Sequence, residues 1–264
     1  MRKLISFVRP GFPAVLLVLA LVGASMACGT TQPPPPAAPA GKKVDPATTG
    51  SIAGKVTFTG KRPPREPLRM GSDQTCVQGA GPHPLSDAVL IAGDGSLQNS
   101  FVYIKDGLDP AYTFDPATST VTLDQKTCRY MPRVLGLRVG QSLEIINSDP
   151  TLHNVHAIPV MNREFNQGLI SQGSRMTHTF TTPEVMIRFK CNVHNWMTAW
   201  VGVLPHPYFA VTGPDGSFVL KGVPPGTYTI EAWHEVFGRQ TATVTVATGQ
   251  AANASFVFRP VDSH

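Results

Sequence analysis

The chain of 264 residues has little that predicts helices, because from residue 50 onward no segment shows a convincing amphipathic helical pattern. Short alternating or apolar runs take their place, separated by Gly, Pro, Asn and Asp. These runs cover residues 52–58, 101–105, 142–146, 176–181, 185–190 and 200–204. Closely spaced short strands joined by turns are typical of β-sandwiches. The expected fold class is therefore all-β.

The chain also has no long apolar run near its start. The stretch from Ala14 to Val22 is much shorter than the roughly 20 residues that cross a bilayer. It follows a basic start and precedes small residues, which is the pattern of a secretion signal rather than of a membrane span. We expect residues 1–27 to be a signal peptide.

The sequence Ser25-Met26-Ala27-Cys28 resembles a bacterial lipobox, although Ser25 stands where that motif usually has Leu. The resemblance implies lipidation of Cys28 and a periplasmic protein anchored to the membrane. The alternative is an ordinary signal peptide that is cut nearby. Residues 28–49 include four consecutive prolines and show no hydrophobic period, which predicts an extended, solvated tether.

The charge balance gives no sign of a nucleic-acid partner. The whole chain has 22 basic and 17 acidic residues, a formal net charge of +5. Residues 1–27 contain three basic and no acidic side chains, so their removal lowers the net charge to +2. The high isoelectric point is thus partly a property of the signal.

The most informative motif is Cys191-Asn192-Val193-His194-Asn195-Trp196-Met197, with His153-Asn154 about forty residues upstream. Together these segments supply one thiolate, two imidazoles and one thioether, which is the ligand set of a blue-copper electron-transfer site. Such a set lets copper alternate between Cu(I) and Cu(II) with little rearrangement of its ligands.

Residues 130–204 resemble the cupredoxins. Val139 to Asn147 resembles the strand before the first histidine ligand, and Val185 to Cys191 resembles the strand that ends at the cysteine. The spacing Cys-x-x-His-x-x-Met is similar to that of amicyanins and pseudoazurins. The resemblance implies one type 1 copper ion in a Greek-key sandwich over residues 50–205, with His153, Cys191 and His194 as equatorial ligands, Met197 as the weak axial ligand, and Asn154 hydrogen-bonded near the thiolate.

Two other interpretations leave these residues without copper. A buried cluster of Cys191, Trp196 and Met197 could be ordinary core packing, but that gives no reason for the histidines. Zinc also binds Cys and His, although Met is a poor zinc ligand. His156 is expected to be hydrogen-bonded or exposed rather than a further ligand.

The cysteine count suggests one disulfide. If Cys28 carries lipid and Cys191 binds metal, then Cys76 and Cys128 remain to pair in an oxidising compartment. A bond from Cys191 to either of them is the alternative.

Residues 206–264 resemble the carboxypeptidase regulatory-like domains, which are transthyretin-like β-sandwiches. The resemblance rests on Gly213 to Phe218 and on Val223 to Tyr228, where Gly and Pro mark two hairpin turns. Residues 50–129 fit the cupredoxin pattern least. They are expected to add the first strands of the copper domain, with a separate transthyretin-like domain as the alternative.

These features predict an electron carrier that is not an enzyme, with a c-type cytochrome or a membrane electron-transfer complex as its partner. Copper delivery, storage or sensing is the main alternative, and a structural surface lipoprotein is another. A copper enzyme would need a second metal centre, often built from His-x-His pairs, and none of the eight histidines forms such a pair.

Overall fold

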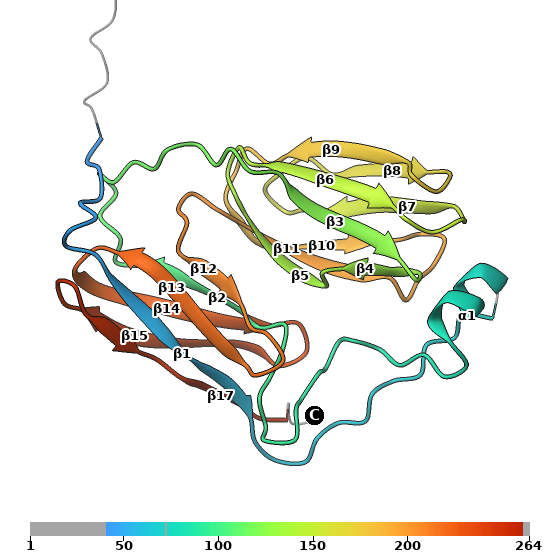
Figure 1. Cartoon of the computed structure of the whole chain (residues 1–264), viewed down its shortest axis with the longest axis horizontal. Helices are drawn as coiled ribbons and strands as arrows, with labels where there is room; N and C mark the ends of the chain where they lie inside the picture. The colour runs from blue at the N-terminus through green and yellow to red at the C-terminus, as the bar shows by residue number, and fades with distance from the viewer. Residues whose placement is uncertain (1–40, 72, 261–264) are drawn as a thin grey trace, which may run out of the picture. The chain divides into compact units, whose positions relative to one another are not determined.

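Strands make up nearly all the regular structure, as the sequence predicts (Figure 1). The structure is a computed structural model that describes residues 41–71 and 73–260. The predicted signal peptide and the predicted lipidation site, Cys28, lie outside these residues. In the described ranges, no helix combines the length and the apolar character that crossing a bilayer requires. The strands form two β-sandwiches.

The first sandwich consists of a five-stranded and a four-stranded sheet. The five-stranded sheet has the order β5-β11-β10-β7-β8, and the four-stranded sheet has the order β4-β3-β6-β9. Their bounds are β3 (Val121–Lys126), β4 (Arg129–Met131), β5 (Val134–Arg138), β6 (Ser142–Asn147), β7 (His153–Ile158), β8 (Phe165–Leu169), β9 (Arg175–Thr179), β10 (Glu184–Lys190) and β11 (Thr198–Leu204).

The core of this sandwich follows from alternation along the strands. On β6, Leu143 and Ile145 are fully buried, while their neighbours are partly exposed. Ile187 and Phe189 on β10 are fully buried in the same cluster. Because burying one such side chain contributes about 1.5–3 kcal/mol, this cluster stabilises the sheets that carry the candidate site.

The second sandwich also contains two sheets. One has the order β13-β1-β16 with β17 paired to β1, and the other has the order β12-β2-β14-β15. Their bounds are β1 (Gly50–Phe58), β2 (Phe101–Asp106), β12 (Phe209–Val211), β13 (Ser217–Val223), β14 (Gly226–His234), β15 (Gly238–Val246), β16 (Ala251–Asn253) and β17 (Phe256–Phe258).

The strand pairing corrects the predicted boundary between residues 50–205 and 206–264. β1 pairs with β13, β16 and β17, and β2 lies between β12 and β14. Figure 1 shows these blue and green strands among the orange and red ones. The expectation that they begin the copper domain is therefore wrong. The first sandwich, residues 121–204, is an insertion in the second.

The physical reason for this correction is the core of the second sandwich. Ile52, Val56 and Phe58 on β1 are buried together with Phe218 and Tyr228. Without β1 and β2, the carboxyl-terminal strands would lack a central strand in each sheet and expose this apolar surface. Local sequence patterns do not report which distant strands share a sheet.

The predicted tether, residues 28–49, also ends earlier than expected. The backbone N–H of Lys42 donates to the carbonyl of Ala111, at 2.8 Å between N and O. The N–H of Thr113 donates in turn to the carbonyl of Lys42, at 2.9 Å. Residues 41–49 thus belong to the folded part of the chain.

A long connection between β1 and β2 contains the short helix α1 (Gln74–Ala80), which the sequence does not predict. The Asp73 carboxylate caps α1 by accepting the N–H groups of Thr75 and Cys76, at 2.8 and 3.2 Å. The disulfide Cys76–Cys128 then joins α1 to the turn between β3 and β4. This is the pairing that the sequence analysis expects.

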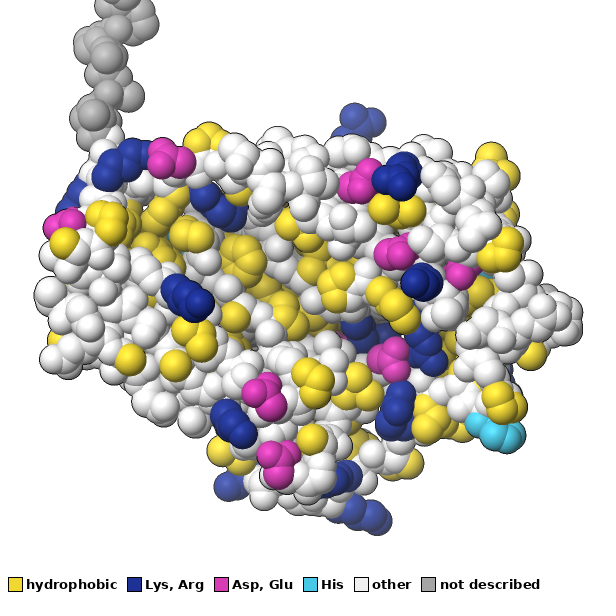
Figure 2. Space-filling view, viewed as in Figure 1, with side chains coloured by type: hydrophobic (Ala, Val, Ile, Leu, Met, Phe, Trp, Pro, Cys, Tyr) yellow, Lys and Arg dark blue, Asp and Glu magenta, His cyan; other side chains and the backbone are white. Residues whose placement is uncertain are grey.

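Two glycines allow the sandwiches to pack against each other. Gly136 and Gly202 are partners on the neighbouring strands β5 and β11. A Cβ atom at Gly202 would lie 2.5 Å from Cζ of Phe101, and one at Gly136 would lie 2.3 Å from Cε2 of Phe209. Aromatic rings therefore occupy the space above both glycines. On one face of the molecule, hydrophobic side chains gather toward the centre (Figure 2).

We predict that Gly202→Ala destabilises the protein by about 1–3 kcal/mol, because the fully buried Phe101 ring must shift. Urea unfolding of the metal-free protein measures this change. Gly168→Ala is the matched control, since Gly168 lies on β8 with no atom within 4 Å of the added Cβ. Equal effects of the two substitutions would contradict the proposed packing.

Candidate metal centre

The pairing of β10 with its two neighbours brings the predicted ligands together. His153 begins β7, and Cys191 directly follows β10. Phe189 and Lys190 of β10 pair with Ala157 and His156 of β7. The turn from β10 to β11 then supplies His194 and Met197. The structure places His153 at the first position of strand β7.

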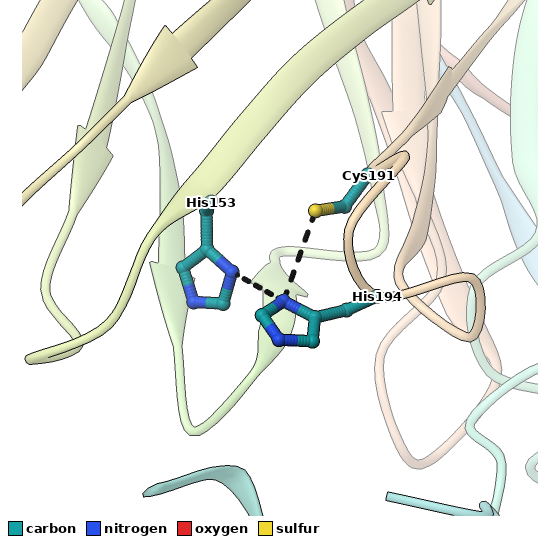
Figure 3. Close-up of side chains that lie close together, drawn as sticks. All are labelled: His153, Cys191 and His194. Atoms are coloured by element: carbon teal, nitrogen blue, oxygen red, sulfur yellow. Dashed lines mark hydrogen bonds between the residues drawn. The ribbon is translucent and has the colours of Figure 1, made fainter. Parts of the chain in front are cut away.

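Three side chains converge in a buried cluster (Figure 3). Nδ1 of His153 lies 2.9 Å from Nδ1 of His194. Nδ1 of His194 lies 3.8 Å from Sγ of Cys191. The exposed fraction is 0% for His153 and 1% for Cys191 and His194. Both imidazoles therefore direct the same type of nitrogen toward the thiol.

These distances fit a shared metal ion. Nitrogen and sulfur ligands that hold one tetrahedral ion at about 2.0–2.3 Å lie roughly 3.3–3.6 Å from one another. The distance between the two nitrogens is shorter than this range, and the distance from nitrogen to sulfur is slightly longer. Small shifts of the imidazole rings would therefore make room for an ion. The soft sulfur and the two imidazole nitrogens suit copper.

The electrostatics of the cluster favour a thiolate. Burial of the Cys191 thiol opposes its ionisation, but interactions with His153 and His194 outweigh burial and lower its pKa to about 6. Burial likewise opposes protonation of His153, yet Asp149 and Cys191 raise its pKa to about 9. Both shifts favour a thiolate beside an imidazolium in the metal-free site, and a bound metal ion would displace that proton.

The turn after Cys191 is closed by its own backbone. The N–H of Met197 donates to the carbonyl of His194 at 3.0 Å, and the N–H of Cys191 donates to the carbonyl of Met197 at 3.2 Å. Met197 is 1% exposed and belongs to the core cluster of the first sandwich. The structure therefore places Met197 beside Cys191 in the turn, and its role as axial ligand stays a prediction.

Asn154 makes the contacts expected of a residue that steadies the site. Its backbone N–H lies 3.5 Å from Sγ of Cys191. Its side-chain oxygen accepts the N–H of Asn192 at 2.5 Å, and its side-chain nitrogen donates to Asn166 at 2.6 Å. One amide thus ties β7 to the turn that carries Cys191.

Sequence reasoning missed two carboxylates outside the ligand cluster. Nε2 of His153 lies 2.9 Å from Oδ2 of Asp149, and Nε2 of His194 lies 3.1 Å from Oδ2 of Asp73. Asp149 precedes His153 by only four residues, so proximity in the chain could have suggested it. Asp73 is 121 residues from His194, and no local pattern connects them.

The other histidines of residues 41–71 and 73–260 lie outside the cluster. His156 contacts Glu164 and Asn192 on the other face of β7, as its offset from His153 predicts. His178 packs between Phe165 and Phe180. His206 is buried and bonds the carbonyl of Ile104, while His83 lies in a loop.

Comparison with known proteins assigns one segment of the chain. Residues 202–259 match the family described as carboxypeptidase regulatory-like domain. This match begins within β11 and includes neither β1 nor β2, the two strands that precede the insertion. Among curated proteins, no significant match to the sequence was found.

Solved structures similar to the chain include cupredoxins. A novel purple cupredoxin from Nitrosopumilus maritimus is 23% identical, covers 31% of this chain and 98% of its own, and has a TM-score of 0.28. A point mutant of amicyanin in its Cu(I) state is 21% identical, with coverages of 39% and 97% and a TM-score of 0.30. A Cu-containing nitrite reductase from Thermus scotoductus is 22% identical, with coverages of 46% and 27% and a TM-score of 0.30. TM-scores this low do not assign the chain to the family of any of these structures. The copper hypothesis therefore depends on the arrangement of His153, Cys191 and His194.

We predict that Asn154→Ala destabilises the metal-free protein by about 1–3 kcal/mol, because the partly buried N–H of Asn192 loses its acceptor and the side-chain oxygen of Asn166 loses its donor. Chemical unfolding measures the effect. Asn192→Ala is the control, since its side chain bonds only His156 at the surface. A control as destabilising as Asn154→Ala would refute this role.

Proposed function

We propose that the chain is a type 1 copper protein that transfers single electrons between redox partners. The observation that supports this most strongly is the convergence of Cys191, His153 and His194 in a buried cluster at the end of a β-sandwich. Copper bound by a thiolate, two imidazoles and a thioether exchanges one electron between Cu(I) and Cu(II). The proposal includes no bond-making or bond-breaking chemistry.

The chain's own residues would perform three tasks in this function. Cys191, His153 and His194 hold the ion, with Met197 as the proposed axial ligand. The pairing of β7 with β10 would hold these residues in place when the copper changes its oxidation state. Burial of the cluster excludes water, which limits reorganisation when the charge changes.

Copper delivery or storage is the less favoured function. A site that passes copper to a partner needs ligands that the partner can reach. The three donors here are at most 1% exposed, and Met197 is 1% exposed as well. Such burial favours retention of the ion over its exchange.

Exposed apolar side chains beside the ligands suit a transient redox partner. Leu152 precedes His153 and is 42% exposed, and Val193 precedes His194 and is 48% exposed. We propose that a c-type cytochrome or a membrane electron-transfer complex docks on these side chains. Electron-transfer encounters of this kind bury less than about 1,200 Å².

The central test is a titration of the purified full chain with Cu(II), followed by visible and EPR spectroscopy. We expect an intense blue thiolate-to-copper band with narrow hyperfine splitting. Cys191→Ser should abolish the band, because the thiolate is its source. His156→Gln should retain it, because this histidine faces away from the cluster. A colourless or weakly bound copper complex in the unmodified chain would rule out the proposal.

We also propose that the protein resides in the periplasm, anchored through lipid on Cys28. We predict that Cys28→Ser prevents incorporation of labelled fatty acid and releases the protein from the membrane fraction. Cys76→Ser serves as a control for the loss of a cysteine. Unchanged labelling of the Cys28→Ser variant would favour an ordinary cleaved signal peptide.

A further inference from the structure

The carboxylate of Asp73 contacts His194 from outside the ligand cluster. Its Oδ2 atom lies 3.1 Å from Nε2 of His194 and accepts the hydroxyl of Thr151 at 2.8 Å. Its Oδ1 atom caps α1. One side chain therefore connects the helix, the loop before His153 and the second histidine. The side chain of His194 is 2% exposed.

The hydrogen bond to Asp73 selects one tautomer of His194. A carboxylate accepts hydrogen bonds, so Nε2 of His194 must carry the proton. Nδ1 then presents its lone pair to His153 and Cys191, which is the arrangement that a metal ligand requires. Asp149 accepts a hydrogen bond from Nε2 of His153, which leaves Nδ1 of that ring directed at His194.

The Cys76–Cys128 disulfide links the two segments that carry Asp73 and Asp149. Cys76 donates its N–H to Asp73 at 3.2 Å, and Cys128 donates its N–H to Asp149 at 2.7 Å. The bond between the two cysteines thus joins the supports of both histidines. Trp196 closes the remaining side, because its ring lies 5.1 Å from that of His194 and its Nε1–H donates to the carbonyl of Cys128 at 3.0 Å.

We propose that Asp73 is a positioning residue of the metal centre, held over His194 by α1 and by the Cys76–Cys128 disulfide. It fixes the Nε2–H tautomer and the ring orientation of His194. Its negative charge stabilises Cu(II) relative to Cu(I), and so lowers the reduction potential of copper bound there. Only the effect on the reduction potential rests on the proposed copper function. The tautomer of His194 and the covering of the site by Asp73 are properties of the metal-free protein.

The test uses Asp73→Ser in the full chain. Serine is a good helix N-cap, so α1 keeps its cap while His194 loses the carboxylate. We expect Cu(II) affinity to fall about 10–100-fold, as for other residues that support metal-bound histidines. If Cu(I) affinity stays unchanged, each tenfold loss raises the reduction potential by about 59 mV.

Two further readouts need no copper. Nitrogen-15 NMR of the metal-free protein should show His194 as the Nε2–H tautomer, and Asp73→Ser should shift it toward a mixture. A thiol reagent should modify Cys191 of the metal-free variant at least tenfold faster, because the contacts of Asp73 with His194 and Thr151, which close the cluster on this side, are lost. Replacing both Cys76 and Cys128 by Ser should produce the same acceleration, with little further effect of Asp73→Ser.

Glu164→Gln is the matched control, since it removes one carboxylate that contacts His156 instead of a ligand. A potential shift in Glu164→Gln as large as that in Asp73→Ser would show a general effect of charge and overturn the positioning role. An unchanged His194 tautomer in Asp73→Ser would overturn it as well. If the unmodified chain forms no blue complex, the proposed function fails, and the tautomer and thiol measurements still decide the role of Asp73.

Discussion

The pairing of β10 with β7 on one side and with β11 on the other is the constraint on which the site depends. It brings the end of one strand beside the start of another, so Cys191 lies next to His153 and Asn154. The turn into β11 is short, and His194 lies within it between Cys191 and Met197. Hydrogen bonds across the turn fix its conformation, and the buried core beneath it keeps both strands in register.

Much of the site could be predicted from the sequence, because its donors lie in two short segments with characteristic spacing. Cys191, His194 and Met197 share one turn, and Asn154 directly follows His153. The Cys76–Cys128 bond could be anticipated only by counting cysteines. Asp73 could not be predicted, since the residue that it supports is far away in the chain and an aspartate before a seven-residue helix looks like an ordinary cap.

The fold, too, could be predicted only where it depends on residues close together in the sequence. Alternation of apolar and polar residues predicts strands and the all-β class correctly, because the period of a strand is a local property. It does not predict which strands share a sheet. β1 and β2 have patterns that would suit either sandwich, and only the buried contacts of Ile52, Val56 and Phe58 with carboxyl-terminal residues decide between them.

The insertion of the first sandwich into the second determines how the protein responds to force. A chain held by its amino-terminal segment is held through β1, which is hydrogen-bonded to β13, β16 and β17. Tension from that side is therefore borne by the ladders of the second sandwich. The strands that carry His153 and Cys191 are not part of these ladders, so a load on the amino-terminal segment acts first on the second sandwich.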